Sequence, residues 1–195
     1  MCIFDCAILN QYFMKKCVTL IAVLLCLCAS LHAQAVDGLT PQQQKAISQK
    51  IEKLTAGFKQ QLIKANENPS SVEFKLDTFR IERWAAACLE LDESDASMRQ
   101  VEAERAGLYD SLLNKYYHKL NDVLKGDDRK ILQQAQRNWL QYRDSELQLL
   151  STVAKDEYSG GGTIQRLINA SEYTSIVEGR TIAIFNHYQR AIQAE

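Results

Sequence analysis

Residues 135–144, with the sequence Ala-Gln-Arg-Asn-Trp-Leu-Gln-Tyr-Arg-Asp, carry the side chains with the clearest chemical requirement. On a helix, Trp139 and Tyr142 fall on one apolar face, in register with the aliphatic residues before them. Gln136 and Arg143 lie at the edge of that face. A guanidinium group on a packing face costs free energy unless a partner pairs with it. The pattern therefore predicts a packing helix whose arginine requires a polar partner elsewhere in the chain.

That partner is predicted on the preceding helix. Only two or three residues around Gly126 separate the two helices, and short connections place helices antiparallel and adjacent. We therefore expect Asp110 to pair with Arg143 or Arg137, and Asn114 to hydrogen-bond into the same group. The alternative is that Arg143 and its neighbour form a binding edge. The full predicted structural polar cluster comprises Asp110, Asn114, Gln136, Arg137, Trp139, Arg143 and Asp144.

Catalytic and metal-binding chemistry has little support in the sequence. Beyond the N-terminal segment, the histidines are His118 and His187, and neither belongs to a Glu-x-x-His or His-x-x-x-His pattern. The chain has no Gly-x-Ser-x-Gly elbow and no phosphate-binding loop. A Cys88–His pair and an anion-binding nest at glycines 160–162 are less favoured than a buried thiol and a plain turn. We expect no catalytic residue, no metal and no cofactor.

Residues 1–35 have the pattern of a secretory signal peptide. A basic start at 14–16 precedes an apolar run at 17–31, and Ala-Gln-Ala at 33–35 fits a cleavage site. The run is short for a membrane span, and Met14 is a candidate for the true start. We therefore expect a periplasmic or secreted protein without a stable membrane span after cleavage. A retained N-terminal anchor is the alternative.

The remaining 160 residues are enough for one domain with its own core. Removing Lys15, Lys16 and Asp5 leaves 21 basic and 23 acidic residues, a net charge of −2 that gives no indication of nucleic-acid binding. Cys88 is the one cysteine left, so no disulfide framework forms within the chain. We expect it to be buried; a reactive or intermolecular thiol is the alternative.

The scarcity of proline favours long helices, and we expect an all-α antiparallel bundle with an additional N-terminal helix. Alternating apolar residues at 72–76 predict a short extended segment. The domain boundaries expected are a helix and linker at 36–71 and a helical domain at 72–195. The predicted helices are Thr40–Ala65, Thr78–Leu91, Ala96–Leu124, Arg129–Lys155 and a last one capped by Thr163.

The first helix carries its own start signals and a narrow apolar stripe. Thr40 and Gln43 form a capping box, and Pro41 suits the first helical position. The stripe is heptad-like and could either pack within the chain or pair with another chain. Its members are Ile47, Ile51, Leu54, Phe58 and Leu62.

Four segments form a recognisable combination: Asp110-x-x-Leu113-Asn114-x-x-Tyr117, Ala135-Gln136-Arg137-x-Trp139-Leu140-x-Tyr142-Arg143-Asp144, Gly161-Gly162-Thr163, and Arg180 in the last helix. Their order and spacing resemble the LprI-like lysozyme-inhibitor domain family of small exported helical bacterial proteins. The resemblance covers residues 78–192 and leaves the first helix outside it. Family members often carry cysteines after the Arg-Asp pair and within the last helix, and this chain has none at either place.

The resemblance implies a non-enzymatic binding protein of the cell envelope whose protein partner is lysozyme. Such an inhibitor would occlude an acidic cleft with a protruding loop or helix end, and a slightly acidic protein is attracted to a basic enzyme. The motif residues are interpreted as scaffold, so no binding residue is carried over, and the oligomeric state stays open. The alternative is a structural or assembly protein that uses the N-terminal helix to pair with a partner chain.

Overall fold

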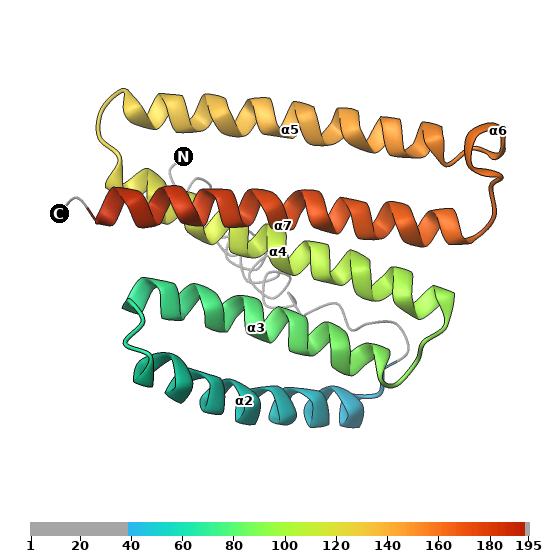
Figure 1. The fold of residues 1–195 in the computed structure, drawn as a ribbon, viewed down its shortest axis with the longest axis horizontal. Helices are drawn as coiled ribbons and strands as arrows, with labels where there is room; N and C mark the ends of the chain where they lie inside the picture. The colour runs from blue at the N-terminus through green and yellow to red at the C-terminus, as the bar shows by residue number, and fades with distance from the viewer. Residues whose placement is uncertain (1–38, 194–195) are drawn as a thin grey trace, which may run out of the picture. The chain divides into compact units, whose positions relative to one another are not determined.

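Six helices make up the part of the chain that the computed structural model describes, residues 39–193, and no strand occurs there (Figure 1). The prediction of an all-α helical bundle is confirmed. The predicted signal peptide at 1–35 lies outside the described residues. The helices are α2 (Pro41–Lys64), α3 (Pro69–Leu89), α4 (Asp95–Val123), α5 (Asp128–Val153), α6 (Asp156–Ser159) and α7 (Ile164–Ile192).

Local capping chemistry determines where several helices begin. At α2 the Thr40 hydroxyl accepts a 3.3 Å hydrogen bond from the Gln43 backbone, and the Gln43 side chain accepts a 2.8 Å bond from the Thr40 amide. This is the predicted capping box. Ser94 caps α4 by accepting a hydrogen bond from the Ser97 amide. Thr163 precedes α7 without a side-chain capping bond, so the capping role predicted for it is wrong. Asp127 precedes α5 and makes no side-chain capping bond either.

The extended segment predicted at residues 72–76 is wrong, because these residues belong to one continuous helix, α3. Asn68 caps α3 and Pro69 occupies its first turn. Val72 packs with Leu62 of α2, whereas Phe74 joins the core formed with α4 and α7. A helix that packs on two sides buries residues on both, so the alternation reflects two partners and not a strand.

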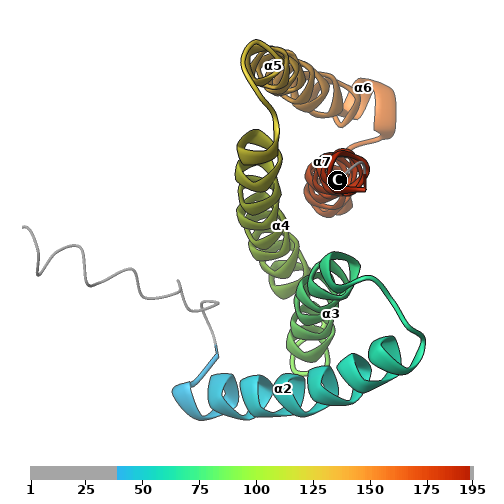
Figure 2. The same cartoon turned by 90° about the vertical axis from the view of Figure 1, so that its left-hand side faces the viewer.

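The central core lies between α4 and α7, which run in the same direction and pack along much of their length (Figures 1 and 2). Tyr116 is fully buried in this core, where its ring meets Phe74 and Phe185 edge-on. The last two rings stack on each other at 3.9 Å. On α7, Thr181 is fully buried and donates a 3.1 Å hydrogen bond to the Tyr109 carbonyl of α4. Small β-branched threonines thus allow the two helix backbones to approach closely.

The stripe of α2 is largely used for packing inside the chain. Ile47, Ile51 and Leu62 are buried, and α2 packs against α3. This arrangement supports the intramolecular alternative for the stripe. Leu54 stays 41% exposed and Phe58 is partly buried, so these two residues remain at a surface.

Helix α5 departs furthest from the predicted arrangement. Its main neighbour is α7 and not α4, and Leu132 is its one buried residue. The α4–α5 connection is short, as expected, but it holds only the adjoining helix ends together. Beyond that end, apolar side chains of α5 such as Tyr142 and Leu149 stay more than half exposed. The single-turn α6 and the glycines at 160–162 then lead the chain back to α7 (Figure 1).

Candidate functional site

The predicted polar cluster does not assemble as one unit. Asp110 accepts a 3.2 Å hydrogen bond from Asn114 on its own helix. Arg143 donates from Nε and Nη2 to the carboxylate of the adjacent Asp144, at 3.0 and 2.8 Å. Within residues 39–193, neither Arg137 nor Arg143 forms an ion pair with Asp110. The predicted pairing is wrong because it required α5 to pack along α4.

Four side chains of the family motifs meet instead between α5 and α7, around the indole of Trp139. They are Gln136, Trp139 and Arg143 of α5 and Arg180 of α7. The guanidinium carbon of Arg143 lies 5.5 Å from the ring centroid and that of Arg180 lies 5.8 Å from it, both distances at which a cation attracts an aromatic face. Arg180 also donates a 3.1 Å hydrogen bond from Nε to Oε1 of Gln136. Trp139 is partly buried against the core.

Arg180 was absent from the predicted cluster, although its position signals a role. It lies three residues after Val177 and four before Ile184, both fully buried, so it stands beside the core face of α7. Its Nη2 is buried without a hydrogen-bond partner, and burial lowers its pKa by desolvating the charged form. No carboxylate of the described residues pairs with it. A half-buried cation with a neutral partner makes the α5–α7 contact a weak one.

A stronger ionic cluster connects α3, α4 and α7, centred on Arg105. Its guanidinium lies 3.0 Å from Glu82, 3.2 Å from Glu102 and 3.0 Å from Glu178. Burial desolvates the charged guanidinium, but the three carboxylates outweigh that effect and raise its pKa. The Tyr109 hydroxyl donates to Glu82 at 2.8 Å, and burial together with these carboxylates raises the pKa of the phenol. Long-range partners of this kind leave no local pattern in the sequence.

A second ionic cluster connects the first half of α3 to the second half of α4. Lys115 lies 2.6 Å from Asp77 and 2.8 Å from Glu73, and Lys119 also pairs with Glu73. Burial raises the pKa of the Glu73 carboxyl, but the two lysines more than offset this and hold the pKa below its usual value. The two ionic clusters hold α3, α4 and α7 together, and α5 takes part in neither.

The residues considered for catalysis or metal binding do not come together. Cys88 is 2% exposed and free, and burial raises its thiol pKa, which confirms the expected buried thiol. His118 and His187 are exposed. The glycines at 160–162 all have positive φ, and a side chain at Gly161 would overlap Asp156. In residues 39–193, no group of three or more His, Cys, Asp and Glu side chains could hold a metal ion.

The described helices thus define a small all-α protein whose α3, α4 and α7 share one core. Residues 87–183 match the family described as Lysozyme inhibitor LprI, so this part of the chain is an LprI-family domain. The match confirms the resemblance and runs from the end of α3 into α7. No curated protein and no solved structure matches the chain. Between residues 39 and 193, no helix is long and apolar enough to cross a lipid bilayer.

Proposed function

We propose that this protein is an exported, non-enzymatic protein of the cell envelope that binds lysozyme and inhibits it. The observation that carries the proposal is the LprI-family domain at residues 87–183. The match covers all of α4, all of α5 with its arginine–tryptophan contact, and α7 as far as residue 183. The partner is therefore a protein, and lysozyme is the partner that the family description names.

Exposed acidic side chains support the end of the bundle that holds the α3–α4 turn and α6 as the lysozyme-binding surface. The α3–α4 turn and the α6 segment lie toward the same end (Figure 1). Lysozyme is a basic protein, so acidic loops at this end would attract it over a distance of about 10 Å at moderate salt. The exposed acidic residues there are Asp92, Glu93 and Asp95 in the turn, and Asp156 and Glu157 in α6.

A lysozyme assay with purified protein comprising residues 36–195 tests the proposal. The rate at which lysozyme lyses a cell-wall suspension should fall as the protein approaches equimolar amounts, and the effect should weaken as salt rises. Replacing Asp92, Glu93 and Glu157 by amides should weaken inhibition. Asp122→Asn near the end of α4 and Asp128→Asn at the start of α5 should not, because both residues lie at the opposite end of the helices. Full lysozyme activity at a large excess of protein would remove lysozyme as the partner.

Export is part of the proposal. The domain boundary predicted at residues 71–72 falls inside the continuous helix α3, so it is not kept. The signal-peptide pattern at 1–35 supports a periplasmic or secreted location. Expressing the full chain in a bacterial host and determining the N-terminus of the exported form tests it. The expected N-terminus is Val36, and a chain that stays in the cytoplasm with residues 1–35 intact would contradict export.

A further inference from the structure

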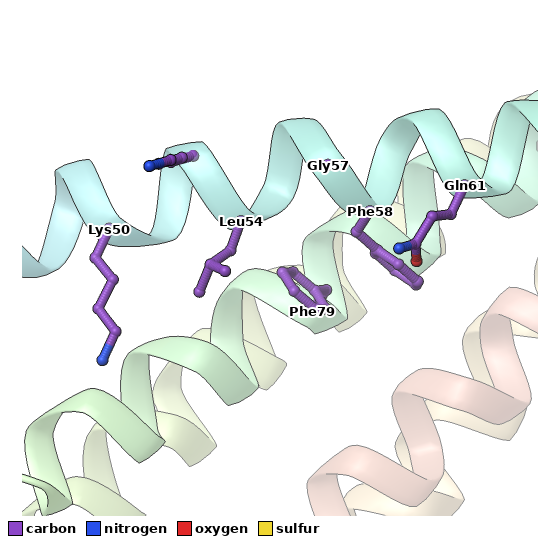
Figure 3. A pocket seen from close by; sticks show the side chains of 7 residues that line it. Lys50, Leu54, Gly57, Phe58, Gln61 and Phe79 are labelled. Atoms are coloured by element: carbon purple, nitrogen blue, oxygen red, sulfur yellow. The ribbon is translucent and has the colours of Figure 1, made fainter.

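An apolar groove follows the seam between α2 and α3, and all of its lining residues lie outside the family-matched residues 87–183. Phe58 of α2 and Phe79 of α3 stack at 4.6 Å and form part of its wall. Hollows of about 600 and 550 Å³ both include these two rings in their lining. Figure 3 shows the larger one, with Leu54, Phe58 and Phe79 pointing into the space between the helices and Lys50 and Gln61 toward its ends.

Basic side chains surround this groove. Lys50 and Lys53 line it from α2, Lys75 and Arg83 line it from α3, and Glu82 is its one acidic lining residue. Helix α2 as a whole holds five lysines and one glutamate, a net charge of +4, in a chain whose total is −1. The rest of the chain therefore carries −5, so α2 is a basic helix in an acidic chain, and two of its five lysines, Lys50 and Lys53, line the groove.

Two of these cations are available to a ligand. Lys50 is paired with Glu90 and Lys75 with Glu67, but Lys53 is exposed and forms no ion pair within residues 39–193. The Arg83 guanidinium lies 5.3 Å from the centroid of Phe79, so it stands directly above an aromatic wall of the groove. A ligand for this surface therefore needs apolar groups flanked by negative charges.

We propose that the α2–α3 groove binds an acidic amphipathic helix of a protein partner. The larger hollow extends from Lys50 to Gln61, about 16 Å along α2, which matches about three turns of a helix. A helix lying in the seam between two others buries its apolar face and leaves its acidic flanks beside Lys53 and Arg83. The groove thus gives the protein a second partner surface, of opposite charge to the acidic end proposed for lysozyme.

Shape and charge favour an acidic amphipathic helix over a lipid bilayer or a second copy of this chain, which could also cover an apolar surface. A lipid bilayer is flat and cannot fill a hollow between two helices. A second copy of this chain would have to offer an exposed apolar helix, and α5 has that character. However, α5 carries four basic and three acidic residues, so its charge does not complement the lysines of α2.

Gly57 keeps the groove open and offers a direct way to block it. This glycine lines the larger hollow, and a Cβ placed on it meets no atom within 4 Å. The Cβ of a leucine at this position has open space around it, so the side chain extends into the hollow, and leucine also favours the helix more than glycine does. Gly57→Leu should therefore remove the binding surface while the protein stays folded. Gly107→Leu is its matched control, since Gly107 is an exposed glycine of α4 with the same open surroundings.

The test measures fluorescence anisotropy of a labelled synthetic peptide titrated with protein comprising residues 36–195. The peptide is about five helical turns long, with leucine on one face and glutamate on the others. We expect saturable binding that weakens with salt and falls by about tenfold or more in Gly57→Leu and in Lys53→Glu. Gly107→Leu should bind as the wild type does. Lys59→Glu should also bind normally, because Lys59 is on α2 but does not line the groove.

Three results would overturn the proposal. The first is no binding of the acidic peptide, or equal binding of a peptide with lysine in place of each glutamate. The second is loss of binding in Gly107→Leu or Lys59→Glu to the same extent as in the groove variants. The third is binding to phosphatidylglycerol vesicles, or self-association in sedimentation, that Gly57→Leu abolishes, because a lipid surface or a second copy would then be the occupant.

Discussion

Arg180 of α7 donates a 3.1 Å hydrogen bond from Nε to Oε1 of Gln136 on α5, while its Nη2 is buried without a partner. This guanidinium therefore crosses a helix interface with a neutral acceptor and no carboxylate. Arg105 of α4 has the opposite environment, with three carboxylates within 3.2 Å. Because Arg180 has one neutral partner and Arg105 has three carboxylates, we expect α5 to separate from the bundle more easily than α3, α4 and α7 separate from one another.

Gln136→Ala should loosen α5 without unfolding the protein. The substitution removes the hydrogen-bond acceptor of Arg180, and a half-buried charged donor without a partner costs about 1–3 kcal/mol. Hydrogen–deuterium exchange followed by mass spectrometry should show faster exchange in peptides from 136–153, and unchanged exchange in α4. Gln134→Ala is a suitable control, since Gln134 bonds only to Asn138 on the same exposed helix surface. Equal acceleration in α4 would show that α5 is not an independent unit.

Replacing each arginine by methionine should have opposite consequences. Arg180→Met removes a cation that lacks an anionic partner and keeps the apolar stem, so the free energy of unfolding should stay equal or rise by up to about 2 kcal/mol. Arg105→Met leaves three carboxylates close together without their cation, and should cost about 3–5 kcal/mol.

Urea unfolding followed by far-ultraviolet circular dichroism measures both free energies. The wild type is the reference for both variants, and the slope of each transition shows whether unfolding remains two-state. A loss for Arg180→Met as large as that for Arg105→Met would mean that Arg180 is fully paired in solution.

The starts of α2 and α4 have local causes, which the sequence can reveal. The Thr40 hydroxyl and the Gln43 side chain are three residues apart, and Ser94 similarly caps the helix that follows it. The helix at 69–77 was missed for the opposite reason. Val72 and Phe74 are both buried because α3 has neighbours on two sides, and only the tertiary structure reveals that.

The site was harder to predict than the fold because it depends on which helices are neighbours. The pairing of Asp110 with Arg143 assumed that a short connection places two helices side by side along their whole length. In this structure the short connection joins only the ends of α4 and α5, and Trp139 of α5 contacts Arg180 of α7. Glu102 lies three residues before Arg105 on α4, a spacing visible in the sequence, but Glu82 and Glu178 come from α3 and α7, so their meeting with Arg105 has no counterpart in residue spacing.

The buried phenols of Tyr109 and Tyr116 should make the protein less stable at alkaline pH. Burial raises the pKa values of Tyr109 and Tyr116 far above the ordinary value of 10, and nearby carboxylates raise them further. Each phenol has a higher pKa in the folded state than the value of about 10 that it has in the unfolded chain. The folded protein therefore keeps its full stability below pH 10, and the free energy of unfolding falls as the pH rises above 10. The absorbance of tyrosinate should therefore show these two phenols ionising only together with the loss of helical circular dichroism. Reversible ionisation of all tyrosines in the folded protein would contradict the structure.

The uneven packing of α5 predicts that two leucines on one helix differ sharply in importance. Leu132 is 7% exposed and belongs to the core shared with α4 and α7, whereas Leu149 is 55% exposed. Leu132→Ala removes a buried side chain and leaves a cavity, so it should lower the free energy of unfolding by about 2–5 kcal/mol. Leu149→Ala should change it by less than about 0.5 kcal/mol, because an exposed side chain loses few contacts.

Thermal unfolding of these two variants also reports on what covers α5 in solution. Exposed apolar side chains along α5 would be protected if another molecule packed against them, and Leu149→Ala would then be costly at high protein concentration. For the isolated chain we expect the same midpoint for Leu149→Ala and wild type at every concentration, and a clearly lower one for Leu132→Ala. A concentration-dependent loss at Leu149 would show that α5 has a partner and that the exposed face of this helix is an interface.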